Sequence, residues 1–200
     1  MNIFAIVGPS GVGKSLLVSE LVKEDFYSIP VFTDRAKRPG EKKVVDREYL
    51  TVEEFDKFLE KFIYWFEFQG HRYGYKKSDI EKCKRKNLNA CLNITPTHLP
   101  YLINKLPELI TIYLRVLPDN YDLLFKRMVK RDISSEDSES AKEDKIDKIK
   151  SRLNHALSEE DNFGSLELLL KQNKLSRVFN ITGDGELFDE VLPYISSVCA

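Results

Sequence analysis

Short apolar runs alternate with stretches of helical spacing along most of the chain. The first run, residues 2–7, ends at a glycine, and residues 15–22 then carry apolar side chains at helical spacing. Three later runs, at residues 89–94, 109–116 and 177–181, have the composition of strands. Strands that alternate with helices predict a parallel sheet covered on both faces. The pattern therefore predicts an α/β fold.

The pattern changes after the first predicted helix. Residues 27–33, 48–51 and 62–75 have the composition of short strands joined by turns, which indicates a small lobe inserted at one end of the sheet. The last of these, FIYWFEFQGHRYGY, holds seven aromatic side chains. We expect Gly70 and Gly74 to provide its turn and the close approach of its two strands. Strand alternation then lets one face pack the lobe while the other lines a pocket.

An acidic segment lies between two predicted helices. Residues 133–145, ISSEDSESAKEDK, contain only Ile133 and Ala141 as apolar residues and so cannot bury themselves. Helical spacing covers residues 121–131 before it and resumes at Ile146 after it. We expect the segment to be mobile, either as a surface loop or as a closing lid.

Composition narrows the possible binding partners and the cellular compartment of the protein. The chain has 200 residues and a net charge of −1, so no excess of positive charge argues for binding to nucleic acid or to an anionic membrane. Its three cysteines show no metal-binding spacing and fit a reducing compartment. No run of eighteen apolar residues occurs. We expect a cytoplasmic protein with neither a nucleic acid nor a membrane as partner.

The strongest motif is GPSGVGKS, which satisfies G-x-x-x-x-G-K-[ST] between a predicted strand and a predicted helix. Its glycines let backbone N–H groups turn toward a phosphate at the positive end of the helix. Lys14 adds a charge at the terminal phosphates, and the Ser15 hydroxyl is placed to ligate Mg²⁺. The motif predicts a site for ATP as co-substrate with Mg²⁺, formed by Gly8, Pro9, Ser10, Gly11, Val12, Gly13, Lys14 and Ser15.

The order of the motifs resembles the guanylate kinase family. GPSGVGKS is followed by TDRAKRPGE and DREYLTVEEF, which are similar to the family's T-R-x-P-R-x-G-E and D-Y-x-F-x-x-x-x-E-F stretches. The similarity continues through WFEFQGHRYG, RMVKR and SRL, and covers nearly the whole chain. It implies a P-loop NTPase three-layer fold with a parallel central sheet, an inserted α+β lobe and a helical lid. It also implies γ-phosphoryl transfer from ATP to a nucleoside or deoxynucleoside 5′-monophosphate, giving the diphosphate and ADP.

The resemblance implies one domain with three parts, and nucleotide substrates as partners of a monomer or homodimer. The parts are a core of residues 1–29, 88–131 and 153–200, an acceptor-binding small lobe of residues 30–87, and a lid of residues 132–152.

Several residues match positions of the family that contact phosphate. Arg35 and Arg38 match its two arginines that bind the acceptor phosphate, and Tyr73 matches its phosphate-binding tyrosine. Planar guanidinium groups suit phosphate oxygens, whereas the alternative for such a pair in a Pro/Gly-rich loop is surface charge. The residues implied to be catalytic are Lys14 and the lid arginines Arg127, Arg131 and Arg152. Asn180 stands where the family has an asparagine near adenine.

The base-reading positions depart from the family. Val31, Tyr64 and Tyr75 stand where it has a serine or threonine, a glutamate and a second serine or threonine. Unpaired guanine donors would cost about 1–3 kcal/mol for each group. A register shift of three would offer Glu67 as a substitute reader on the same side of the strand as Trp65. The sequence therefore predicts altered or relaxed base choice.

Three further positions differ. Arg47 replaces the family's second phosphate-binding tyrosine, and Asn93 and Thr95 replace two aspartates. Asparagine can still hydrogen-bond a hydroxyl group or a Mg²⁺-bound water, but it holds the metal less firmly than a carboxylate does. Simple drift around a retained fold would explain the same changes.

Two alternatives remain open. Residues 93–100, NITPTHLP, resemble the N-G-S-R-x-H-L-P of ribose 1,5-bisphosphate phosphokinase, which would make His98 functional rather than a partly buried helix-start residue. Arg38 argues against this sugar-phosphate kinase. The second alternative is a non-catalytic guanylate-kinase-like interaction module, but such modules usually lose the phosphate loop that is intact here.

Overall fold

The central sheet of the protein is parallel, as the alternating pattern predicted. The computed structural model describes residues 1–37, 47–183 and 185–199. The sheet has five strands in the order β2-β7-β1-β8-β9, and all of their pairings are parallel. Its strands are β1 (Ile3–Val7), β2 (Tyr27–Ser28), β7 (Ala90–Ile94), β8 (Ile110–Arg115) and β9 (Arg177–Asn180).

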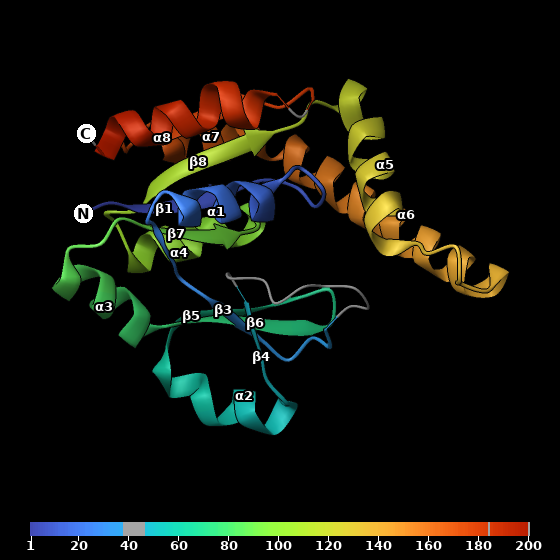
Figure 1. Cartoon of the computed structure of the whole chain (residues 1–200), viewed down its shortest axis with the longest axis horizontal. Coiled ribbons are helices and arrows are strands. Elements are labelled where there is room, and N and C mark those ends of the chain that lie inside the picture. Colours follow the sequence, from blue (N-terminus) through green and yellow to red (C-terminus); the bar gives the residue numbers. More distant parts are fainter. Residues whose placement is uncertain (38–46, 184, 200) are drawn as a thin grey trace.

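Helices cover both faces of this sheet because its central strands are apolar on both sides. Along β1, Ile3, Ala5 and Val7 pack on one face and Phe4 and Ile6 on the other. The first face is covered by α3 (Lys77–Lys86), α4 (Leu99–Lys105) and α7 (Phe163–Leu170). The other is covered by α1 (Lys14–Lys23), α5 (Tyr121–Asp132), the π-helix η4 (Leu187–Val191) and α8 (Leu192–Cys199). Figure 1 shows these layers above the small lobe.

The small lobe is built on a second sheet with the order β4-β3-β6-β5. Its elements are β3 (Val31–Thr33), β4 (Arg47–Tyr49), α2 (Val52–Phe58), η1 (Leu59–Lys61), β5 (Phe62–Phe68) and β6 (His71–Lys76). Thr51 caps α2 by accepting the Glu54 N–H, and the Glu54 carboxylate accepts the Thr51 N–H in return. Phe32, Phe55 and Phe62 form the lobe's own core.

The two glycines of FIYWFEFQGHRYGY act as expected. Gln69 and Gly70, both at positive φ (53° and 74°), form the turn between β5 and β6. A Cβ on Gly74 would lie 2.8 Å from Cγ of Phe62, so only glycine allows this close approach.

The helix after the acidic segment is longer than the sequence pattern indicated. It is α6 (Glu139–Asp161), which begins seven residues before Ile146. The Ser138 side chain accepts the Ala141 N–H at its start, and the ion pair Lys142–Glu139 (2.7 Å) lies on its first turn. The interpretation of residues 133–145 as a surface loop is therefore wrong from Glu139 onward, because capping and charge pairing support a solvated helix without burial.

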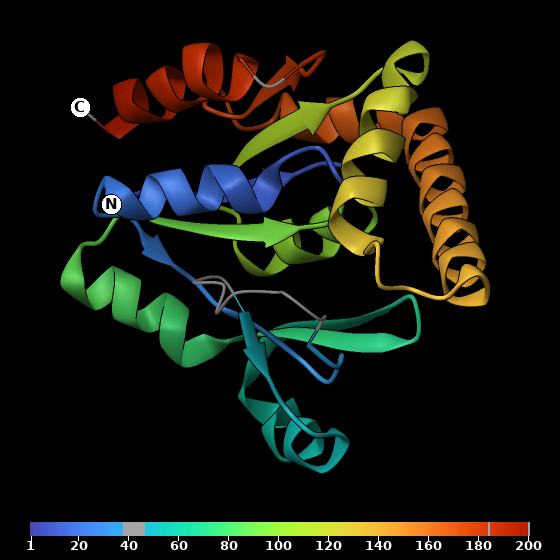
Figure 2. The same ribbon diagram turned by 45° about the vertical axis from the view of Figure 1, so that its right-hand side comes forward.

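The helices α5 and α6 stand together beside the sheet, and the tip of the β5–β6 hairpin approaches them from the small lobe (Figure 2). Two short 3-10 turns, η2 (Pro96–His98) and η3 (Pro118–Asn120), complete the described elements. Among the helices of the described residues, none is long and apolar enough to cross a membrane.

Replacing Gly74 with alanine tests the close approach in the small lobe. We expect Gly74→Ala to lower the free energy of unfolding by about 1–3 kcal/mol, because its Cβ would overpack the Phe62 ring. The matched control is Gly164→Ala in α7, where a Cβ meets no atom within 4 Å; this change should raise stability by up to about 1 kcal/mol. Urea denaturation measures both, and equal effects of the two substitutions would contradict the packing argument.

Candidate functional site

A cavity of about 410 Å³ lies between the phosphate loop, the small lobe and the α5–α6 pair. Six of its lining side chains are basic, and among the described lining residues none carries a carboxylate. The lining residues are Ser10, Gly11, Gly13, Lys14, Ser15, Leu16, Val31, Arg35, Arg47, Phe66, Phe68, Gln69, Tyr73, Tyr75, Asn93, Ile94, Thr95, Arg127, Arg131 and Arg152. This composition suits a ligand that carries several negative charges.

The loop between β1 and α1 has the backbone geometry that its glycines permit. Gly8 has φ of 148°, and a Cβ there would lie 2.4 Å from the carbonyl oxygen of Leu114 on β8. Gly13 precedes α1 with φ of 114°, so the loop enters the helix through a left-handed residue. The Lys14 ammonium donates to the carbonyl oxygens of Gly8 (2.7 Å) and Pro9 (2.8 Å). The loop therefore holds its lysine at the cavity by its own backbone.

The side chains of the described residues do not form a magnesium site by themselves, so such an ion would bind mainly through the phosphate groups of a nucleotide. The described residues contain no group of three or more His, Cys, Asp or Glu side chains that could hold a metal. Mg²⁺ commonly keeps several waters and binds through one or two protein groups and the phosphates of a nucleotide. Ser15 is the first-turn hydroxyl of α1 on the cavity wall, so it would be the protein ligand of an ATP-bound ion.

Arg35 is nearly buried, with 8% of its surface exposed. Its backbone N–H donates to Thr33 Oγ1 (3.1 Å), and its guanidinium donates to the Ala36 carbonyl (2.9 Å) and the Tyr49 hydroxyl (3.2 Å). The structure thus brings Arg35 to the cavity together with Arg47 and Tyr73. Arg38, the second arginine expected there, lies outside the described residues.

Strand alternation on β5 decides which of its side chains reach the cavity. Phe66 and Phe68 line it, whereas Glu67 is exposed on the opposite face of the strand and does not. Tyr64 shares the face of Phe66 but places its hydroxyl 3.1 Å from Nδ1 of His98, away from the cavity. The cavity therefore includes neither Tyr64 nor Glu67.

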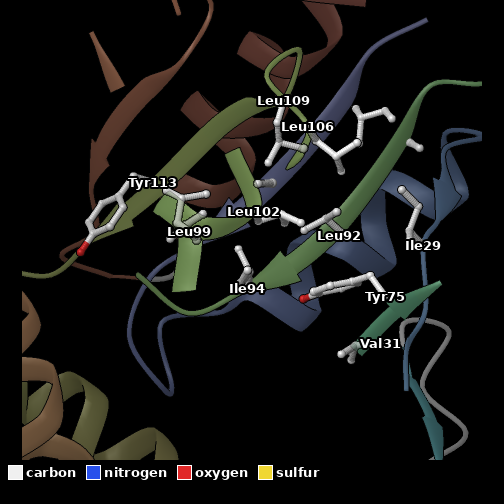
Figure 3. Close-up of a cluster of buried hydrophobic side chains, with 14 of the residues drawn as sticks. Ile29, Val31, Tyr75, Leu92, Ile94, Leu99, Leu102, Leu106, Leu109 and Tyr113 are labelled. Atoms are coloured by element: carbon white, nitrogen blue, oxygen red, sulfur yellow. The ribbon is translucent and has the colours of Figure 1, made fainter. Parts of the chain in front are cut away.

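Tyr75 lines the cavity with an almost wholly buried side chain. Its hydroxyl donates to the backbone carbonyl of Asn93 (2.6 Å), which joins β6 to the end of β7. Figure 3 shows Tyr75 beside Val31 at the edge of the apolar cluster that packs under the central sheet. The tyrosine hydroxyl is thus occupied by the protein's own backbone, and Asn93 and Thr95 are lining residues of the same cavity.

His98 packs against Phe66 without lining the cavity itself. Its ring stacks on Phe66 with centroids 4.0 Å apart, and burial lowers the pKa of His98. The histidine is not among the cavity residues, so the structure favours the helix-start interpretation of this position. Sequence reasoning missed Phe66, Phe68 and Gln69 as lining residues, although the alternation of β5 could have indicated the two phenylalanines.

The three expected lid arginines all reach the cavity. Arg127 donates to the carbonyl of Val12 (3.1 Å) in the phosphate loop and to that of Gly183 (2.8 Å). Asp132 accepts from both Arg131 (2.8 Å) and Arg152 (2.6 Å). One carboxylate just outside the lining therefore holds two of the arginines.

One of these arginines also contacts the small lobe. Arg152 also reaches the hairpin turn of the small lobe, where its Nε donates to Oε1 of Gln69 (3.3 Å). The α6 helix thus contacts the small lobe across the cavity. Asn180, expected near adenine, ends β9 as an exposed residue outside the cavity lining.

Comparison with known proteins agrees with this arrangement. A family model described as guanylate kinase matches residues 1–179. The guanylate kinase of Mycoplasma genitalium is 31% identical over 185 residues, covering 90% of this chain and 72% of that protein. The guanylate kinase of Shewanella sp. strain MR-7 is 30% identical over 174 residues, covering 84% of this chain and 78% of that protein.

A solved structure supports the fold independently. The crystal structure of guanylate kinase from Anaplasma phagocytophilum matches with a TM-score of 0.65 and 16% identity, covering 98% of this chain and 85% of that one. The ordered motifs, the parallel sheet with its inserted lobe and the family match over most of the chain lead to one conclusion. The chain belongs to the guanylate kinase family.

Proposed function

We propose that this protein transfers the γ-phosphoryl group of ATP to a nucleoside or deoxynucleoside 5′-monophosphate, with base choice altered or relaxed. The observation that carries the proposal is the cavity itself. It joins an intact phosphate loop, which includes Lys14, to five arginines, and its described lining offers no carboxylate to read guanine. The guanylate kinases that the chain resembles support the reaction type.

The acceptor phosphate is the nucleophile in this reaction, so no general base is required. Its attacking oxygen forms a bond to the γ-phosphorus as the bond to the β,γ-bridging oxygen breaks, leaving ADP. The protein's task is positioning and charge stabilisation. Lys14 and the phosphate loop would hold the donor, and Arg35, Arg47 and Tyr73 would hold the acceptor phosphate. Bound Mg²⁺ would neutralise charge on the transferring phosphates.

The lid arginines supply the remaining positive charge. Arg127, Arg131 and Arg152 line the cavity on the side opposite the small lobe. Guanidinium groups there would stabilise charge on the transferring phosphoryl group, where a low-dielectric site makes each hydrogen bond strong. Asp132 orients two of these arginines before any substrate binds.

Base choice follows from the neutral groups on the acceptor side. Guanine presents a ring N–H and an amino group, both donors, and a carboxylate accepts from them best. Here the polar side chains at the end of β7 are Asn93 and Thr95, which can donate as well as accept. The Thr95 Oγ1 atom is buried, and among the described residues no hydrogen-bond partner reaches it. Neutral acceptors of this kind bind the guanine amino group less strongly than a carboxylate does.

A panel of monophosphates tests the function and its selectivity together. We expect turnover with ATP and Mg²⁺, and a kcat/KM ratio of GMP to IMP below about tenfold, because hypoxanthine lacks only the amino group. Thr95→Asp should raise this ratio by restoring an acceptor-only group. Lys14→Ala, the matched inactive control, should lose nearly all activity.

Other outcomes of the same panel would contradict the proposal. Turnover of ribose 1,5-bisphosphate without any nucleotide would favour the sugar-phosphate kinase. Tight ATP binding without turnover of any acceptor, together with partner binding that Lys14→Ala leaves unchanged, would favour the interaction module. A strong preference for GMP over IMP in the unmodified protein would overturn the altered base choice.

Residues 132–152 are proposed to be a lid that closes on the substrates. The lid and the small lobe already meet at Arg152 and Gln69, and the rings of His155 and Phe68 lie 5.1 Å apart just beyond the lid. Hydrogen exchange should be fast at residues 133–138 in the free protein, and a bisubstrate analogue should slow exchange at the ends of α5 and α6. Exchange that the analogue leaves unchanged would make this segment a surface loop.

A further inference from the structure

A largely buried ion pair joins β6 to the segment that directly follows β3. Each of the two carries an expected ligand of the acceptor phosphate. Asp34 follows β3 directly and precedes Arg35, and Arg72 precedes Tyr73 on β6. The Asp34 carboxylate accepts the Arg72 backbone N–H (2.8 Å) and its Nε–H (2.6 Å). The side chains are 9% and 17% exposed, respectively.

This pair continues the strand pairing by one step beyond the end of β3. The last backbone pair between β3 and β6 is Thr33 with Tyr73, so Asp34 stands directly opposite Arg72. There the carboxylate, rather than a strand carbonyl, accepts the Arg72 N–H. A charge-assisted bond of this kind is stronger than the neutral ladder bond it replaces. Without it, the backbone pairing that the structure describes between this segment and β6 would end at Thr33.

Arg72 also reaches helix α2 on the side of the sheet away from the cavity. Its Nη1 lies 2.5 Å from Asp56 Oδ1, its Nη2 donates to the Val52 carbonyl (3.1 Å), and its guanidinium lies 4.6 Å from the centre of the Phe55 ring. The pair is therefore anchored to the lobe's own core. Neither Asp34 nor Arg72 lines the cavity.

We propose that Asp34 and Arg72 are positioning residues for the acceptor phosphate, which hold Arg35 and Tyr73 at a fixed separation across β3 and β6. This inference rests on the proposed function, because it assigns the phosphate-binding role to these two neighbours. Burial alone would raise the pKa of Asp34, but its hydrogen bonds to Arg72 and that residue's charge lower it. The carboxylate is accordingly ionised at neutral pH, as the pairing requires.

Kinetics of matched variants test the positioning role. Asp34→Asn and Arg72→Met should each raise the KM for the best monophosphate by about 10- to 100-fold, because a misplaced ligand loses much of its effect. The KM for ATP should stay within about twofold, since the phosphate loop is untouched. The control is Asp56→Asn, which removes the other carboxylate of Arg72 and should leave both values nearly unchanged. The double variant Asp34→Asn with Arg72→Met should be no worse than the worse single variant.

Amide hydrogen exchange gives a readout that needs no catalysis. In the free protein, Asp34→Asn and Arg72→Met should speed exchange at residues 33–36 and 72–74, whereas Asp56→Asn should not. Near-UV circular dichroism shows whether each variant is folded. If Arg72→Met does not fold, Asp34→Asn provides the test, because it keeps the shape of the side chain.

The outcomes separate this inference from the proposed function. An unmodified protein that neither binds nor turns over any monophosphate overturns the proposed function, and the exchange comparison still decides whether the pair fixes the two strands. With an active unmodified protein, an acceptor KM raised no more by Asp34→Asn than by Asp56→Asn overturns the positioning role. Equal rises in the KM values for ATP and acceptor would also overturn it, because they indicate a general loss of structure.

Discussion

The structure depends on holding several positive charges close together around one cavity. Like charges at this spacing repel, and the described lining residues contain no carboxylate that would offset them. The protein instead uses backbone oxygens and acids placed just outside. Lys14 and Arg127 donate to carbonyls of the phosphate loop. Asp132 forms ion pairs with two lid arginines, Arg131 and Arg152. These bonds hold the four side chains in place at the cavity.

In the small lobe, too, the described carboxylates lie outside the cavity lining. The Arg35 guanidinium donates to the Ala36 carbonyl and the Tyr49 hydroxyl. Two acids of the lobe, Asp34 and Asp56, engage Arg72 on the far side of the sheet. Keeping these carboxylates away from the cavity preserves its positive potential, and the Asp34–Arg72 pair still links β6 to the segment that follows β3. The aromatic side chains of β5 and β6 then supply an uncharged wall. Under the proposed function, charged groups would bind the phosphates and uncharged groups would contact the base.

Particular residues show how far the sequence could be interpreted. The phosphate loop, the parallel sheet, the inserted lobe and the roles of Gly70 and Gly74 were all predicted correctly, because each depends on local spacing or backbone geometry. The start of α6 was not, because charge pairing and a cap support a helix that has little apolar periodicity there. Tyr64 and Glu67 were expected at the acceptor site, yet neither lines the cavity.

The sequence by itself determined the side chains available to this protein: a glycine-rich phosphate loop, a set of arginines, and Val31, Tyr64 and Tyr75 at the positions that the resemblance matches to base-reading residues. Those features are encoded in contiguous stretches whose backbone conformation depends on their own residues. Only the tertiary structure decided which side chains share the cavity. His98 draws the Tyr64 hydroxyl away from it, and the Asn93 carbonyl occupies that of Tyr75. These partners lie 34 and 18 residues away along the chain, so no local pattern could reveal them.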